Sequence, residues 1–131
     1  MDILSKQAIL DIVSINSFIT DGQKNETVNY QNYTKTVKPK IEDFKSKHKK
    51  TPNLLLKDTL LLFRSQLEEP YHLQNYGYYG NNKLREYTWS CLYYKFPNVE
   101  NLYASYSPQL FILVNSKGIK FGISYGKQLF S

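Results

Sequence analysis

The segment from Gln109 to Tyr125 constrains the fold of this chain more strongly than any other. Two apolar runs flank a short loop, Asn115-Ser-Lys-Gly118, which ends in a glycine. Apolar runs on either side of such a loop predict a β-hairpin, with strands over 109–115 and 119–125. The second strand places four apolar side chains on one face: Ile119, Phe121, Ile123 and Tyr125. We therefore expect an antiparallel sheet in the second half of the chain.

A further strand is predicted over residues 87–96, where aromatic and β-branched side chains are frequent. The segment before it reads Tyr76-Gly-Tyr-Tyr-Gly80-Asn-Asn. Its glycines permit positive φ and its asparagines tolerate it, so we expect a flexible and exposed turn. The lone tryptophan, Trp89, follows this turn on the predicted strand.

Helices are predicted in the first half of the chain. Apolar residues recur at mostly helical spacing over about 3–18, and Asp2 precedes them as the expected cap. A shorter helix is predicted over 39–48, because Pro39 fits the first helical turn and apolar residues follow it.

A third helix is predicted over 52–68. Thr51 and Pro52 form a helix start, because a hydroxyl side chain caps the first turn and proline fits the first helical position. The leucine-rich pattern that follows is more typical of a core helix than of a partner-binding surface. Residues 21–38, by contrast, are mostly polar and fit either a surface loop or an edge strand.

The order of the elements indicates the fold class. Helices precede strands instead of alternating with them, which favours an α+β fold over a parallel α/β fold. We expect the N-terminal helices to pack on a mostly antiparallel sheet that ends in the C-terminal hairpin. The 131 residues suffice for a single domain, with a helical half over about 1–70 and a sheet half over about 71–126.

The charge balance favours a polyanionic partner. Lys and Arg number 17 against 11 Asp and Glu, which gives a net charge of +6. Such a surplus suits nucleic acid without requiring it. A run of lysines beside the predicted helix 39–48 fits either a solvated face or a patch that contacts phosphates without choosing a sequence. These lysines are Lys38, Lys40, Lys45, Lys47, Lys49 and Lys50.

Several classes of protein are disfavoured. One cysteine, Cys91, and two distant histidines provide neither a disulfide framework nor a cysteine-rich zinc site, and we expect no cofactor or metal. The N-terminus lacks the layout of a signal peptide and no apolar run is long enough to span a membrane, so we expect a soluble, cytoplasmic protein. No phosphate loop, metalloprotease motif or nucleophile elbow is present, so we expect a binding domain and not an enzyme.

The aromatic turn and Trp89 together suggest a binding site for a planar ring. Trp89 and a tyrosine, Tyr78 or Tyr79, can stack on such a ring, and a nucleobase is a ring that a basic protein readily meets. A protein that inspects a base within a duplex must extrude it and hold it between such side chains. The alternative interpretation is that Trp89 is simply the largest residue of the core.

The same segment resembles the N-terminal domain of the McrB family, the DNA-recognising subunits of modified-cytosine-dependent restriction systems. The resemblance covers roughly residues 75–126. Its pieces are Tyr79-Gly80 in a loop, Trp89-Ser-Cys-Leu on an apolar strand, the run from Gln109 to Val114, and Ser124-Tyr125-Gly126 at the end of a hairpin. Thr88 stands where the family often has proline, and the loop is slightly longer than in the family.

The resemblance implies a DNA-binding domain that flips a modified cytosine into an aromatic pocket. By position, Tyr79 and Trp89 would hold the flipped base, with Tyr78 beside them and Phe111 or Leu113 as the wall. The basic side chains assigned to the DNA backbone are Lys38, Lys40, Lys45, Lys47, Lys49, Lys50, Lys83 and Arg85. In that family a GTP-hydrolysing AAA+ motor follows the domain and a separate nuclease, McrC, cuts the DNA. A motor and a McrC-like nuclease are therefore the implied partners of this recognition module.

Two other functions remain open. One is the binding of RNA or single strands, with the tyrosines as stacking platforms. The other is a protein-interaction domain in which the aromatic residues form the core and the lysines keep the protein soluble. A steep loss of affinity with salt distinguishes a nucleic-acid binder from this last class. Duplexes with and without a modified cytosine distinguish the McrB-like function from the single-strand function.

Overall fold

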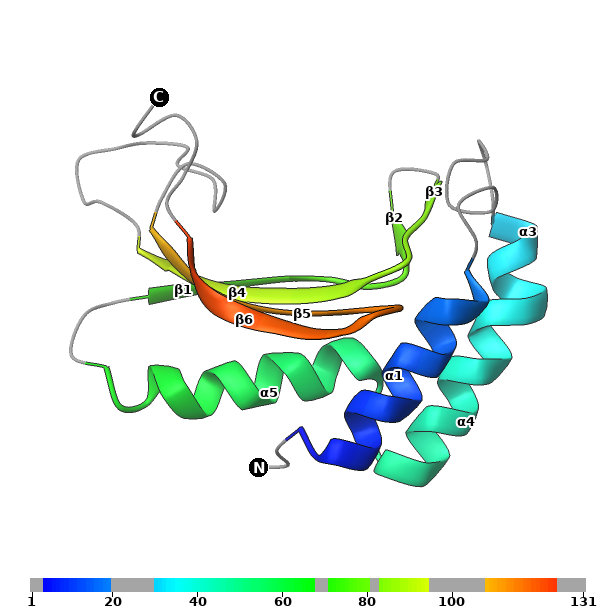
Figure 1. Cartoon of the computed structure of the whole chain (residues 1–131), viewed down its shortest axis with the longest axis horizontal. Helices are drawn as coiled ribbons and strands as arrows, with labels where there is room; N and C mark the ends of the chain where they lie inside the picture. The colour runs from blue at the N-terminus through cyan, green and yellow to red at the C-terminus, as the bar shows by residue number, and fades with distance from the viewer. Residues whose placement is uncertain (1–3, 20–29, 68–70, 81–82, 95–107, 125–131) are drawn as a thin grey trace.

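The computed structural model describes residues 4–19, 30–67, 71–80, 83–94 and 108–124 (Figure 1). Helices occupy the first part of the chain: α1 (Lys6–Phe18), α3 (Tyr30–Asn32), the π-helical η1 (Tyr33–Val37), α4 (Lys38–His48) and α5 (Pro52–Arg64). Strands occupy the second part: β1 (Tyr71–Tyr76), β2 (Tyr79–Gly80), β3 (Lys83–Leu84), β4 (Thr88–Tyr94), β5 (Gln109–Asn115) and β6 (Gly118–Ser124). The predicted α+β class is confirmed.

The four long strands form one antiparallel sheet in the order β1-β4-β5-β6. Strands β5 and β6 form the predicted C-terminal hairpin, with Asn115 opposite Gly118 at its closed end. Gly118 has a φ of 138°, a conformation that side chains with a Cβ rarely adopt, so glycine is needed here. The short strands β2 and β3 pair separately, and their hairpin rises from one end of the sheet on the side away from α5 (Figure 1).

Helices cover one face of the sheet (Figure 1). Helix α5 packs against β1 and β4, whereas α1 packs against β5 and β6. The strand side chains that face the helices include the buried Leu92, Ile112 and Val114. They meet Ile12 of α1 and Leu56 of α5 in a single core. Because burying one such side chain contributes about 1.5–3 kcal/mol, this layer of contacts holds the helices on the sheet.

Helix α1 begins later than predicted. Ser5 is the N-cap in place of Asp2, and its hydroxyl accepts a hydrogen bond of 3.1 Å from the backbone N–H of Ala8. The expected start at residue 3 is therefore wrong, because Ser5, three residues after Asp2, supplies the side chain that satisfies a free amide of the first turn. The predicted apolar face is present, since Ala8, Ile12 and Ile15 are buried.

A continuous helical segment runs from Tyr30 to His48 through α3, η1 and α4. Its first part corrects the prediction of a loop or edge strand over residues 21–38, of which 21–29 lie outside the described residues. The helix predicted over 39–48 is confirmed and extends further upstream. Apolar side chains recur in this segment at intervals of three or four residues: Tyr33, Val37, Ile41 and Phe44. This spacing keeps one side of a helix against the core, which a strand would not do.

Helix α5 ends at Arg64 and not at residue 68 as predicted. Thr51 has the extended backbone of an N-cap but makes no capping hydrogen bond with its side chain, and Pro52 occupies the first turn. The buried leucines are Leu55, Leu56 and Leu60, and the exposed apolar side chains are Leu54, Phe63 and Leu67. The predicted core role therefore holds for one side of the helix.

Strand β1 has no counterpart among the predicted strands, because polar residues interrupt its apolar pattern. Antiparallel pairing with β4 along all six residues defines it as a strand. The exposed turn expected over 76–82 is wrong in its described part. Tyr78 is only 3% exposed, and the pair Tyr79–Gly80 bonds to β3. Residues 81 and 82 lie outside the described part of the chain.

The strands predicted over 87–96, 109–115 and 119–125 correspond to β4, β5 and β6. Residues 95, 96 and 125 lie outside the described residues. Across the described ranges, no helix is both long enough and apolar enough to cross a membrane. The same ranges contain no group of three His, Cys, Asp or Glu side chains placed to hold a metal ion.

Candidate nucleic-acid interface

The second face of the sheet, away from α1 and α5, carries three of the predicted base-pocket residues. Side chains alternate along a strand, so Trp89 lies on the opposite face from the core residue Leu92. Trp89 is paired with Leu113 of β5, and Phe111 lies two residues along β5 on the same face. All three side chains are partly buried. The register therefore joins Trp89, Leu113 and Phe111 into one apolar surface, which we call the Trp89 face.

A glycine on β6 lies next to this surface. Gly122 is the β6 partner of Phe111, and the Phe111 ring lies 3.8 Å from the place where a Cβ of residue 122 would stand. The ring thus lies beside the glycine, at a distance at which a Cβ would make an ordinary van der Waals contact. The aromatic surface extends in this way from β4 across β5 towards β6.

Tyr78 does not belong to the Trp89 face. It is 3% exposed and packs in the core beside Leu84. Burial raises the pKa of its phenol. The nearby Thr88 hydroxyl lowers this pKa only in part. The two hydroxyl groups do not meet the geometry of a hydrogen bond. The prediction that Tyr78 lines an accessible base pocket is therefore corrected: it is a core residue.

Tyr79 belongs to a cluster of three tyrosines between β2 and the helical segment 30–37. Its ring centroid lies 5.5 Å from that of Tyr33 and 5.8 Å from that of Tyr30. Tyr30 and Tyr33 are themselves 6.4 Å apart, and all three separations suit favourable aromatic pairs. Tyr30 is 57% exposed, whereas the other two are partly buried. The ring contacts of Tyr79 are thus with Tyr30 and Tyr33 and not with Trp89.

A π-helical turn supports this tyrosine cluster. Tyr33 is the first residue of η1, and π-helical turns are rare and frequently found at functional sites. Burial raises the pKa of Tyr33, and the neighbouring Tyr30 and Glu42 add to the rise, so its phenol stays neutral at physiological pH. The site predicted from the sequence lacks both Tyr30 and Tyr33. Their spacing of three residues places them on one side of a helix, a signal that depends on recognising 30–37 as helical.

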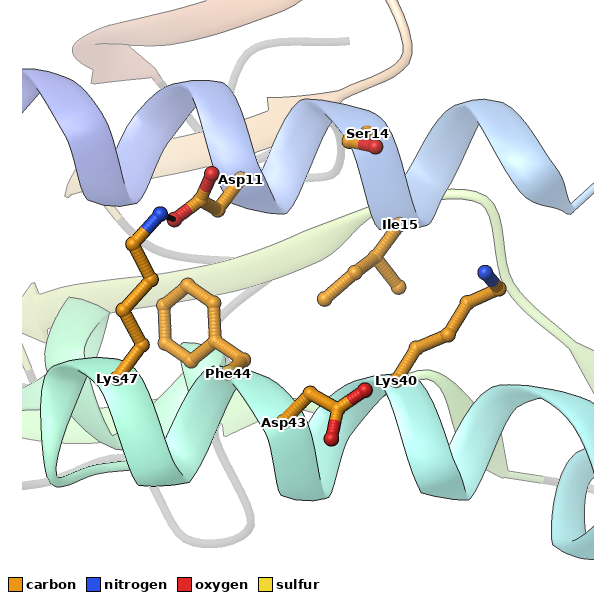
Figure 2. Close-up of a pocket in the computed structure, with 7 residues that line it drawn as sticks. All are labelled: Asp11, Ser14, Ile15, Lys40, Asp43, Phe44 and Lys47. Atoms are coloured by element: carbon orange, nitrogen blue, oxygen red, sulfur yellow. Dashed lines mark ion pairs between the residues drawn. The ribbon is translucent and has the colours of Figure 1, made fainter.

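The lysines predicted to contact the DNA backbone divide into two groups, and the first faces α1. Lys47 Nζ lies 3.1 Å from Asp11 Oδ2 of α1. Lys40 Nζ lies 4.8 Å from the centre of the Phe18 ring. Figure 2 shows Lys47 directed at Asp11 across a hollow of about 240 Å³ between α1 and α4. These two lysines are therefore engaged by the protein itself.

Asp11 joins the contacts between α1 and α4. Its Oδ2 also lies 2.6 Å from His48 Nε2, and its Oδ1 accepts a hydrogen bond of 2.9 Å from Gln7. Burial by itself raises the pKa of Asp11, but the hydrogen bonds from His48, Gln7 and Lys47 more than reverse this, and its pKa lies below the ordinary value. Asp11 therefore remains ionised well into the acid range and holds Lys47.

The second group of lysines is exposed on α4 and at its end: Lys38, Lys45 and Lys49. Lys38 and Lys45 are seven residues apart and lie on the same side of the helix. Among the described residues, none of the three is within ion-pair distance of a carboxylate. Lys50, the next residue, forms an ion pair with Asp58 of α5. Lys38, Lys45 and Lys49 are therefore the exposed lysines of this run that have no carboxylate partner among the described residues.

The remaining predicted basic residues belong to the β2–β3 region. The side chain of Lys83 lies outside the described part of the structure. Arg85 Nη1 donates a hydrogen bond of 3.1 Å to the Tyr87 hydroxyl, and the guanidinium carbon lies 5.9 Å from the centre of that ring. Its backbone N–H donates to the Tyr78 carbonyl at 2.7 Å. Arg85 is thus held against Tyr87.

No model of a known protein family, no curated protein and no solved structure matches this chain. The described residues provide aromatic side chains on the Trp89 face and in the tyrosine cluster, and exposed lysines on and next to α4.

Proposed function

We propose that this chain is a DNA-recognition module that holds an extruded, modified cytosine on the Trp89 face, as in the McrB family that it resembles. The observation that carries the proposal is the strand register that places Trp89 beside Leu113 and near Phe111. A tryptophan with apolar neighbours offers a flat surface on which a base stacks through its ring. The base site of the proposal consists of these three residues and leaves out Tyr78.

Stacking on Trp89 offsets the cost of extrusion. Unstacking and unpairing a base costs a few kcal/mol. Stacking on one aromatic side chain returns about 1–3 kcal/mol. The apolar wall formed by Leu113 and Phe111 favours a base with an added apolar group, because each buried CH₂-sized group contributes about 0.8 kcal/mol. This small additional contribution to the binding free energy is what distinguishes modified from unmodified cytosine.

Tyr79 takes a different part in the proposal from the one predicted. Its ring packs on Tyr30 and Tyr33, so it supports an aromatic rim beside the site and does not close a sandwich with Trp89. Lys38, Lys45 and Lys49 contact phosphates, which fixes the position of the duplex but not its sequence. The module itself does no chemistry; the proposed partners are a GTP-hydrolysing AAA+ motor and a McrC-like nuclease.

The test compares two substitutions of the tryptophan. Trp89→Leu removes the ring and keeps an apolar strand residue, whereas Trp89→Phe keeps a ring. Affinity is measured for a duplex with one modified cytosine and for its unmodified twin, and a fluorescent base analogue opposite the site reports extrusion. We expect Trp89→Leu to weaken binding of the modified duplex about tenfold or more and to abolish extrusion. Trp89→Phe should retain most of both.

Tyr30→Leu is the matched control, because it removes an exposed ring from the neighbouring cluster. It should leave the preference for the modified duplex unchanged. Circular dichroism of each variant establishes that it is folded. Equal affinity of the unaltered protein for the two duplexes would refute the proposed function.

A second candidate function is supported by the tyrosine cluster. Tyr30 is 57% exposed and lines a surface hollow with Gln31, Thr34 and Lys35, so a ring and a cation lie side by side. This combination suits single-stranded RNA or DNA, whose bases stack without sequence choice. The same variants discriminate the two functions. If single strands are the ligand, Tyr30→Leu weakens binding to them and Trp89→Leu does not.

A further inference from the structure

Strand β6 is the outermost strand of the sheet, and no strand among the described residues pairs with its outer edge. Proteins usually protect such edges with prolines, bulges or charged side chains, lysine above all, because free N–H and C=O groups bind other strands. Strand β6 reads Gly-Ile-Lys-Phe-Gly-Ile-Ser and has neither proline nor an acidic residue. Lys120 is its only charged residue, so a single lysine is the only protection of this kind that β6 carries, and no other described strand covers its edge.

The side of β6 that faces the helical layer is strongly apolar. Phe121 is 76% exposed and Ile123 is 67% exposed. Phe121 borders an apolar groove of about 380 Å³ whose other wall includes Phe63 of α5, which is 57% exposed. Large apolar side chains that gather at one place on a surface mark an interaction site.

The pairing of β5 with β6 determines which backbone groups point outward. The two-residue turn at 116–117 closes on the pair Asn115–Gly118. This pair is hydrogen bonded, and hydrogen-bonded pairs recur at every second residue of an antiparallel ladder. The residues whose N–H and C=O groups face the free edge are therefore Ile119, Phe121 and Ile123. Two of them, Phe121 and Ile123, are also the exposed apolar side chains.

We infer that β6 pairs with β6 of a second copy of this chain, antiparallel about a two-fold axis at Phe121, to join the two sheets into one. In this register Phe121 lies opposite Phe121 of the second copy, and Ile119 lies opposite its Ile123. Both members of each pair have outward backbone groups, so they form the hydrogen bonds of an ordinary antiparallel ladder. All seven residues of the strand are paired in this way. Two-fold dimers are the commonest homo-oligomers.

The charge on β6 disfavours one alternative register. Lys120 lies directly opposite Gly122 of the second copy, which leaves space for its side chain, and the two copies of Lys120 are diagonal neighbours about 7–8 Å apart. A shift of the register by one pair towards the hairpin turn would set Lys120 against Lys120, which is unfavourable. The net charge of +6 on each copy repels the other at long range, so the dimer is favoured at moderate and not at very low ionic strength.

The area available matches a weak dimer. The exposed parts of Phe63, Phe121 and Ile123 amount to roughly 300–400 Å² on each copy. With the two strand edges, the total buried surface is on the order of 1,000 Å², at the small end for specific interfaces. We therefore expect a dissociation constant in the micromolar range or above.

The dimer leaves the Trp89 face open. Paired side chains of antiparallel strands lie on the same face, so both helical layers lie on one side of the joined sheet and both Trp89 faces lie on the other. The dimer therefore does not depend on the proposed function and does not obstruct it.

The test uses charge reversal at the two-fold axis in the full chain. Sedimentation velocity from micromolar to millimolar concentration should show the unaltered protein passing from monomer to dimer. Phe121→Lys and Phe121→Glu each place two like charges together and should weaken self-association at least tenfold. An equimolar mixture of the two variants should restore the dimer, because opposite charges then meet across the axis.

The control variants distinguish loss of this interface from a general effect of added charge and from unfolding. Leu54→Lys introduces the same charge at an exposed apolar position of α5 outside the groove and should dimerise like the unaltered protein. Circular dichroism should show all variants folded, since Phe121 is mostly exposed. Three results would overturn the inference. The first is an unaltered protein that stays monomeric at every concentration, in which case the edge would be left to a strand of another protein. The second is a mixture of the two Phe121 variants that associates no better than either variant alone, and the third is loss of the dimer in Leu54→Lys.

Discussion

The carboxylate of Asp11 in α1 contacts two residues at the C-terminal end of α4. It contacts Lys47 and His48, and its side chain is 26% exposed. Burial raises its pKa, but its hydrogen bonds more than reverse this, so the pKa is lower in the folded protein than the value of about 3.9 expected for the unfolded chain. A carboxylate with a lowered folded pKa stabilises the fold above its unfolded pKa. That stability is lost as the pH falls through the folded pKa.

Asp11→Asn should therefore destabilise the protein at neutral pH and have no effect in strong acid. The asparagine keeps an oxygen that can accept from His48 but loses the charge that attracts Lys47. Because the ion pair is partly exposed, we expect a loss of only about 0.5–1 kcal/mol at neutral pH. The difference from the unaltered protein should shrink as the pH falls below the unfolded pKa of about 3.9 and vanish in acid below the folded pKa. Urea denaturation across this range measures it.

Asp43→Asn is the matched control, since Asp43 is an exposed carboxylate of α4 that lines the same hollow. Its substitution should change stability little at any pH. A stability difference for Asp11→Asn that persisted unchanged into strong acid would show that packing and not charge accounts for the effect.

The adjacent residues Tyr78 and Tyr79 show most clearly where the sequence-based prediction and the structure differ. Tyr78 and Tyr79 are chemically identical and adjacent, yet one is in the core and the other joins Tyr30 and Tyr33. Which tyrosine turns inward depends on the point at which the strand alternation restarts after Gly77, and composition carries no information about that point. Trp89, Phe111 and Leu113 are different, because regular alternation along two paired strands is enough to place them on one face.

The lysines on and next to α4 differ in whether they already have an interaction partner within the protein. Lys47 and Lys50 have carboxylate partners within the protein, and Lys40 lies over an aromatic ring. Charges already paired gain less from a phosphate, because the existing pair must first be broken. Lys38, Lys45 and Lys49 have no such cost among the described residues.

Replacing Lys38, Lys45 and Lys49 together by glutamine should weaken binding to every duplex about equally. The slope of log affinity against log salt should fall by about one for each phosphate contact that is lost. Fluorescence anisotropy titrations at several salt concentrations measure both quantities. The preference for a modified cytosine should not change, because phosphate contacts carry no sequence information.

Lys40→Gln combined with Lys47→Gln provides the comparison, since these lysines lie on the side of α4 that faces α1. This pair should reduce the salt slope less per lysine than the triple variant does. Equal effects per lysine would mean that the helix acts only through its total charge, without a defined track for the backbone.

The helices and strands differ in how far sequence patterns determine them. The hairpin β5–β6 and the core of α4 follow from local periodicity and are predicted with nearly correct bounds. Residues 30–37 are helical because Val37 continues the buried side of α4. This pattern is found in the sequence only if the helix is allowed to begin before Pro39. Strand β1 has a polar composition and is determined by its pairing with β4, which is a contact between distant parts of the chain.

Contacts between the first and second halves of the chain determine whether the molecule behaves as one unit. Asn16 of α1 is fully buried, and its Nδ2 donates a hydrogen bond of 2.8 Å to the carbonyl of Val114 in β5. Helix α5 adds apolar contacts with β1 and β4 on the same face. The sheet has no other described cover on this face, and α1 and α5 bury apolar side chains against it. We therefore expect the two halves to unfold together.

Asn16→Ala tests this expectation with two probes. Far-UV circular dichroism reports mainly the helices, and the fluorescence of Trp89, the only tryptophan, reports the sheet. Loss of the buried hydrogen bond should lower the free energy of unfolding by about 1–3 kcal/mol. Both denaturation curves should shift by the same amount and remain superimposed, as a two-state transition requires. Ser17→Ala, at an exposed neighbouring position of α1, should shift neither curve. If Asn16→Ala moved the dichroism curve and left the fluorescence curve in place, the helical half and the sheet half would be separate folding units, and the prediction of a single domain would be wrong.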